Sequence, residues 1–246
     1  MLVFQITHPG TWLRHPDQAC ARRIQPLLGC LEDQLANAVV ALNLFQRQHV
    51  ADAWRPSPAR EAMYDANQQA VEDDIRHELG EEEFFRNFLA VQTIVEQEVR
   101  RRLWAQGEIP VEYARRLPFL YAHLFVYALD SFGKILYVLS KEDGTPQAIR
   151  VEYEGFVSAL PHLKALRDSA HHIEARARAL DRRGQPIRVR ALELSNLWGD
   201  KLAYTAEDGQ LAEVPINETS ARVASSALQR VIDAFDWEGR MRITPY

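Results

Sequence analysis

Apolar residues recur at helical spacing along most of this chain of 246 residues. From about Cys20 to about Val50 they follow the i, i+3, i+4 pattern of a helix with one buried face. Stretches rich in Pro, Gly and polar residues interrupt the pattern at 54–60, 105–110 and 141–146, and each is expected to end a helix. The pattern therefore predicts further helices, one beginning at Pro58 with Ser57 as its N-cap and others over Glu81–Ala105 and Val111–Ser140.

Beyond residue 186 the helical spacing gives way to alternation. The segments 187–194, 201–206 and 211–216 alternate or run apolar, and "NLWGD" and "EDGQ" between them are typical of hairpin turns. A helix follows over 217–235, and the tail 238–246 is expected to be short and loosely held. The predicted fold class is mainly all-α, an up-and-down helical bundle with a small C-terminal β-hairpin over about 187–216.

The helix expected to end at Leu180 carries two adjacent histidines beside its apolar stripe. It is expected to begin at about Val151 or Pro161. The stripe is spaced alternately by three and four residues and comprises Leu163, Leu166, Ala170, Ile173, Ala177 and Leu180. Arg167 and His171 are an i, i+4 pair and are expected to point together, whereas Arg167 and His172 are separated by about 140° around the helix. The two pairs imply two different sites.

The same segment is locally basic, although the net charge of the chain is −5. Between Lys164 and Arg190 there are eight basic residues against three acidic ones. Such a patch can hold a short stretch of phosphate backbone, and Lys164, Arg176 and Arg178 are then the candidate RNA-binding residues. Alternatively, these cations only complement the dipole at the C-terminal end of a solvated helix.

Arginine followed closely by histidine suits the cleavage of RNA. This reaction needs a group that takes the proton of the 2′-hydroxyl, an acid for the leaving oxygen and a cation for the charge on the phosphorane. Histidine titrates near neutral pH, and arginine binds phosphate with a planar fork. Neither a metal nor another cofactor is then required. Because one histidine and one arginine are few for this task, a symmetric dimer that brings two of each into one cleft is expected.

The stretch "RDSAHH", from Arg167 to His172, resembles the R-x(4–6)-H signature of the HEPN superfamily, in which a polar residue follows the arginine. Arg167 and His172 match its ends and Asp168 its polar position. The resemblance implies a helical bundle, a homodimer with the motif at its interface and, in many members, metal-independent cleavage of RNA in toxin or phage-defence systems, where an antitoxin or other protein is a partner. It covers residues 111–246 as a HEPN-like bundle with the hairpin, and leaves 1–110 as an N-terminal helical region.

In this reading Arg167 binds the scissile phosphate, His172 is the general acid and base, and Asp168 orients the arginine or caps neighbouring backbone. If the i, i+4 geometry with Arg167, rather than the spacing of the family signature, determines the site, His171 takes the role of His172. The alternative is a catalytically inactive bundle of the same fold that serves as a binding or adaptor protein. A motif buried in ion pairs would favour the adaptor, whereas two motifs converging across a two-fold cleft would favour the enzyme.

A polar stripe on the predicted helix 111–140 is a candidate supporting element. It comprises His123, Tyr127, Asp130 and Lys134, spaced by four, three and four residues. If the stripe faces the motif helix, Tyr127 and Asp130 can orient the histidine or the arginine. Otherwise it is a solvent edge on which Asp130 and Lys134 pair.

The most apolar stretch, 117–139, is interrupted by Pro118 and by the polar side chains of that stripe, which a lipid-facing span rarely tolerates. The N-terminal residues have neither a positive leader nor an uninterrupted apolar run, so we expect no signal peptide. We therefore expect a cytoplasmic protein with a buried core helix and no membrane partner.

Overall fold

The computed structural model describes residues 1–50, 58–188 and 191–246. These residues are mainly helical and carry small antiparallel sheets, which confirms the predicted fold class. The chain divides into two compact units: unit 1 comprises residues 1–50 and 118–246, and unit 2 comprises residues 51–117. The predicted N-cap Ser57 and the basic residue Arg190 lie outside the described residues.

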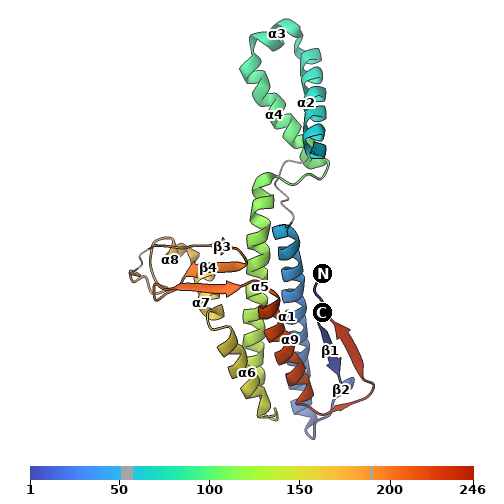
Figure 1. Ribbon diagram of the computed structural model, residues 1–246, viewed down its shortest axis with the longest axis vertical. Coiled ribbons are helices and arrows are strands. Elements are labelled where there is room, and N and C mark those ends of the chain that lie inside the picture. The colour runs from blue at the N-terminus through green and yellow to red at the C-terminus, as the bar shows by residue number, and fades with distance from the viewer. Residues whose placement is uncertain (51–57, 189–190) are drawn as a thin grey trace. The chain divides into compact units, whose positions relative to one another are not determined.

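Unit 1 is built on long helices that run alternately up and down (Figure 1). Helices α1 (Gln18–Val50) and α6 (Ala148–Ala159) run in one direction, and α5 (Val111–Leu139) and α9 (Glu218–Asp233) run in the other. Helix α5 begins in unit 2, and its residues from Pro118 on belong to unit 1. Helix α9 contacts both α1 and α6, and its N-cap is Asn217, whose side chain accepts a hydrogen bond from the backbone N–H of Ser220.

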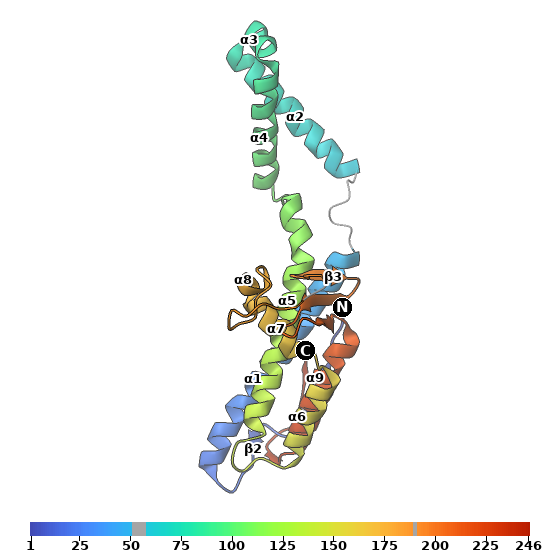
Figure 2. The same ribbon diagram turned by 90° about the vertical axis from the view of Figure 1, so that its left-hand side faces the viewer.

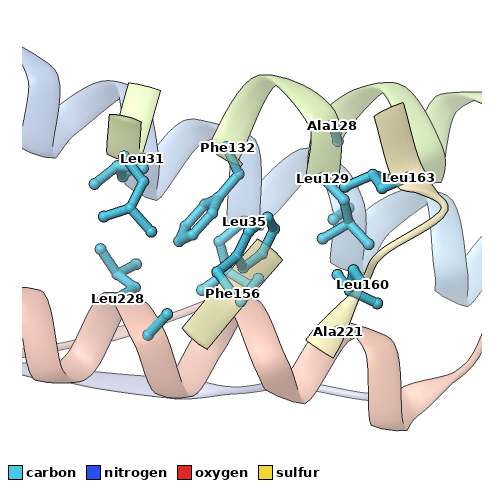
Figure 3. Close-up of a cluster of buried hydrophobic side chains, with 14 of the residues drawn as sticks. Leu31, Leu35, Ala128, Leu129, Phe132, Phe156, Leu160, Leu163, Ala221 and Leu228 are labelled. Carbon is cyan, nitrogen blue, oxygen red and sulfur yellow. The ribbon is translucent and has the colours of Figure 1, made fainter. Parts of the chain in front are cut away.

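The core of unit 1 lies where these helices meet (Figure 3). Leu31 and Leu35 of α1 pack with Leu129 and Phe132 of α5 and with Leu228 of α9. By length and composition α5 could also cross a membrane, because its most apolar window has a mean hydropathy of 1.3. Half of that window is buried, and the buried residues, which include Phe125, Leu129 and Phe132, pack in the core with residues of α1, α6 and α9, so α5 is a core helix of unit 1.

The C-terminal β structure differs from the predicted single hairpin. It is a three-stranded antiparallel sheet of β3 (Asn196–Trp198), β4 (Lys201–Thr205) and β5 (Leu211–Pro215). Strand β3 therefore forms where a turn was expected, and the part of 187–194 that the structure describes forms no strand. The sheet packs against the motif helix, which contacts both β4 and β5.

The prediction of a loosely held tail is wrong. Strand β7 (Arg242–Pro245) pairs with β1 (Gln5–His8), and β6 (Trp237–Glu238) pairs with β2 (Trp12–Leu13). The backbones of Phe4 and Tyr246 exchange two hydrogen bonds, so the termini lie side by side (Figures 1 and 2). These strands have two to four residues each and pair across nearly the whole length of the chain, so the local sequence pattern does not predict them.

Unit 2 consists of α2 (Pro58–Leu79), α3 (Glu81–Arg86), α4 (Phe88–Ala105) and the first residues of α5. The expected helix Glu81–Ala105 is thus divided at Asn87. A small separate core joins α2, α3 and α4, with Val71, Phe84, Val91, Val95 and Val99 as its buried residues.

The predicted division at residue 110 is wrong. Residues 1–50 belong to unit 1, because the apolar face of α1 is covered by α5 and α9, which lie far along the chain. The pattern of α1 predicts that a buried face exists, but it does not say which segment covers that face.

Candidate functional site

The motif helix is shorter than predicted. Helix α7 covers Leu163–His171, and His172 leaves helical geometry with φ −107° and ψ 41°. A single turn, α8 (Ile173–Arg176), follows, and the chain then reverses so that the N–H of Ile187 donates to the carbonyl of Ala179.

The continuous apolar stripe to Leu180 is therefore a wrong prediction. Leu163 and Leu166 are buried, but Ile173 is 44% exposed. A straight helix through Leu180 would leave no room for the reversal that brings Ile187 back to Ala179. The hydrogen bond between Ile187 and Ala179 and the contact of the buried Arg176 side chain with the Leu180 carbonyl outweigh the local helical preference of the segment.

Arg167 is held between two carboxylates. Its Nε lies 3.1 Å from Oδ2 of Asp130 on α5, and its Nη1 lies 2.6 Å from Oδ1 of Asp168 on α7. Asp130, whose side chain is only 7% exposed, also receives Lys134 Nζ at 2.6 Å. Among the described residues the Nε atom of Arg167 has no partner in hydrogen-bond geometry, so its attraction to Asp130 is an ion pair without a directed N–H bond.

The polar stripe of α5 faces the motif helix in its middle part. The rings of Tyr127 and His171 meet edge to face, with centroids 5.4 Å apart. Tyr127 and Asp130 are i, i+3 neighbours on α5, while Arg167 and His171 are i, i+4 neighbours on α7, so two polar pairs oppose one another. The stripe thus contacts the motif helix through Tyr127 and Asp130, and Asp130 also pairs with Lys134, while the supporting role of Tyr127 and Asp130 stays a prediction.

Tyr127 remains a neutral phenol near neutral pH. Burial raises the pKa of its hydroxyl, and the nearby positive charge of Arg167 opposes this shift. The phenol can therefore donate as well as accept a hydrogen bond.

His123, at the start of the stripe, belongs to a different contact. Its Nε2 lies 2.5 Å from the hydroxyl of Tyr204 on β4, and its Nδ1 lies 2.6 Å from the carbonyl oxygen of Phe119. Burial lowers the pKa of His123. This pair joins α5 to the three-stranded sheet, so His123 supports the position of the sheet rather than the motif.

The two histidines of the motif lie in different surroundings. His171 ends α7 on the side of Tyr127, and its side chain is exposed. His172 Nδ1 lies 3.8 Å from Oε1 of Glu174, which itself is exposed. The i, i+4 pair of Arg167 and His171 is thus the one that shares a face toward α5.

Of the three predicted RNA-binding cations, Arg176 was predicted wrongly. Its side chain is 1% exposed, and its Nη1 donates a hydrogen bond to the carbonyl of Leu180, so it stabilises the reversal after α8 and cannot contact RNA there. Arg178 is exposed and donates from Nε to the carbonyl of Glu174. Lys164 is exposed on α7 and forms no ion pair with the described residues.

A pocket of about 410 Å³ adjoins Arg167 between α5, α6 and α7. Arg167, Lys164, Lys134 and Asp130 line its polar part. Its apolar part includes Tyr137 of α5 and Tyr153 of α6, whose rings lie 5.2 Å apart. Neither tyrosine was predicted from the sequence, because no spacing within one helix shows that two helices bring them together.

The arrangement provides a cation, a nearby imidazole and a neutral phenol on one face of the α5 and α7 pair. Arg167 can bind an anionic oxygen, and the ring nitrogens of His171 can accept or donate a hydrogen bond. Within the described ranges no group of three or more His, Cys, Asp and Glu side chains is arranged to hold a metal ion. The chain matches no family model, no curated protein and no solved structure.

Proposed function

We propose that the protein is a metal-independent endoribonuclease of HEPN type that acts in the cytoplasm as a homodimer with a composite active site. The observation that carries the proposal is the opposition of Tyr127 and Asp130 on α5 to His171 and Arg167 on α7. It supplies the phosphate-binding cation and an imidazole on the same face, two of the groups that cleavage requires, and a second copy would double both.

The ion pairs of Arg167 are compatible with phosphate binding. Asp130 is buried and acts as the anchor of the guanidinium, whereas Asp168 is 27% exposed and is the more accessible of the two partners. A phosphate can replace Asp168 at Nη1, since both are anionic acceptors and arginine binds phosphate through two donors. In this proposal Asp168 pairs with Arg167 when no RNA is bound, and the phosphate of the substrate displaces it.

Exposed apolar side chains near the motif support a homodimer. Leu120 and Leu124 on α5 and Ile173 on α8 are each exposed although they are large and apolar. Leu124 lies about one helical turn before Tyr127 on α5. Covering these residues with the same surface of a second copy would place two motifs beside one two-fold axis.

RNA cleavage assays test the proposal. A structured RNA and a DNA of matched sequence are incubated with the wild type and with Arg167→Ala, with and without EDTA. We expect RNA to be cut in EDTA, the products to end in 2′,3′-cyclic phosphate, and DNA to stay intact because it lacks the attacking 2′-hydroxyl. Cleavage that requires a divalent ion, or that persists in Arg167→Ala, contradicts the proposal.

An adaptor role is the second candidate, and the same ion pairs favour it. If Asp130 and Asp168 hold Arg167 permanently, the motif is a structural link between α5 and α7. The adaptor would leave RNA uncut at every pH and would still dimerise. Cleavage therefore separates the two readings, whereas light scattering at micromolar concentration tests the dimer that both share, since a monomer has no composite site.

A further inference from the structure

We infer that the pocket between α5, α6 and α7 binds one unpaired base of the RNA, and that it makes the proposed enzyme selective for single-stranded segments. This inference rests on the proposed function, and it adds a substrate subsite to the Arg167 site. It starts from a cavity of about 410 Å³, which lies within the range of about 300–1,000 Å³ of small-molecule sites.

The walls of the pocket suit a flat aromatic ring. Tyr137 is 46% exposed, and the Tyr153 ring lies beside it at a tilt of 53°. Lys141 Nζ lies over the Tyr137 ring, 5.7 Å from its centroid, so a base would stack on the part of the ring that Lys141 and Tyr153 leave exposed. Val157 and Pro161 add apolar surface. Bases stack on such exposed aromatic rings whatever their identity.

The bottom of the pocket depends on Gly133. A Cβ at this position would lie 2.9 Å from the Phe156 ring, too close for an unshifted side chain. Phe156 therefore packs directly against the backbone of α5, which leaves the space above it to the pocket. Any side chain at this position would push the ring of Phe156 out of its place.

The charges of the pocket fit a phosphate attached to the base. Lys134, Lys164 and Arg167 line it against a single acidic residue, Asp130, within the described lining. Asp130 is already paired with Lys134 and Arg167, whereas Lys164 forms no ion pair with the described residues. Lys164 is thus available to a phosphate at the mouth.

Arg167 lines this pocket and also belongs to the proposed catalytic face. A base in the pocket would therefore place its own phosphate, or the next one, within reach of the guanidinium. A paired base cannot enter because it is stacked inside a duplex, so the geometry favours loops and single strands.

Binding of a substrate analogue that cannot be cleaved tests the subsite separately from catalysis. The probe is a fluorescein-labelled 2′-O-methyl RNA of eight nucleotides, whose blocked 2′-oxygen prevents attack, and anisotropy reports its binding. It is offered as a single strand and annealed to its complement, and unlabelled AMP and UMP are added as competitors. The variants are Tyr137→Leu and Lys164→Gln.

Matched controls are Tyr113→Leu, an exposed tyrosine elsewhere on α5, and Arg150→Gln, an exposed cation on α6 outside the pocket. We expect the single strand to bind better than the duplex. Tyr137→Leu should weaken binding about fivefold or more, and Lys164→Gln should lower the salt dependence of log K by about 0.7 to 1. The controls should match the wild type.

Single-strand affinity unchanged by Tyr137→Leu, or a duplex bound as tightly as the single strand, overturns the subsite. AMP or UMP displacing the probe at concentrations near its own affinity would also overturn it, since a free nucleotide would then be the ligand. Because Lys164 is exposed, Lys164→Gln keeps the test valid if Tyr137→Leu unfolds. Cleavage by the wild type with no effect of Tyr137→Leu on binding refutes the subsite alone, and binding dependent on Tyr137 without cleavage refutes the nuclease alone.

Discussion

Replacing Asp130 by asparagine removes a carboxylate that lies against both Arg167 and Lys134. The Asp130 and Arg167 side chains are 7% and 17% exposed, so little water can replace the lost partner, whereas Lys134 is 57% exposed. Breaking a buried ion pair costs about 3–5 kcal/mol, and the Lys134 contact adds about 0–1 kcal/mol because it is solvated.

Arg167 keeps Asp168 in this variant, which reduces the loss. We therefore expect Asp130→Asn to lower the free energy of unfolding by about 2–3 kcal/mol. The matched variant Asp168→Asn removes the more exposed partner of the same arginine and should cost only about 0.5–1 kcal/mol. Urea titrations at pH 7, followed by far-UV circular dichroism, measure both.

The two variants should also differ in salt. Because the Asp130 pair is shielded from solvent, its contribution should persist at high ionic strength, while that of Asp168 should be screened. Equal losses for the two variants, or a loss for Asp130→Asn no larger than that for Lys134→Gln, would show that Asp130 does not anchor the motif arginine.

Three further outcomes are expected. His171→Ala should slow RNA cleavage by about 100-fold or more and His172→Ala by less than tenfold, because only His171 shares the face of α7 that meets α5; initial rates measure this, and small, equal effects would exclude both as catalytic groups. Burial lowers the pKa of both His8 and His123 below 6.5, the ordinary value for histidine. At a pH below 6.5 the unfolded chain therefore binds more protons than the folded one. Stability should thus be full above pH 6.5 and decline as the pH falls below it, and urea midpoints that rise on acidification would contradict this sign. Arg176→Ala should lower the free energy of unfolding by about 2–4 kcal/mol because the side chain is buried; loss of RNA affinity with unchanged stability would show that the side chain reaches the ligand instead.

The candidate site was partly predictable from the sequence. The i, i+4 spacing of Arg167 and His171 needs only a local helix, and the stripe of α5 likewise names Tyr127 and Asp130. That the two sets oppose one another depends on how α5 and α7 pack, which the structure supplies. Arg176 was misassigned because an arginine in a basic segment gives no sign of burial.

The sequence by itself determined the long helices, because their periodic apolar faces and their Pro and Gly interruptions are local features. It therefore predicted α1, α5 and α9 close to their observed bounds. Only the tertiary structure decided what covers each face. It joined residues 1–50 to the C-terminal half, paired β1 with β7, and ended the motif helix at His171, because these outcomes depend on contacts between segments far apart in the chain. The pocket between Tyr137, Tyr153 and Arg167 exists for the same reason, as α5, α6 and α7 enclose it only when packed together.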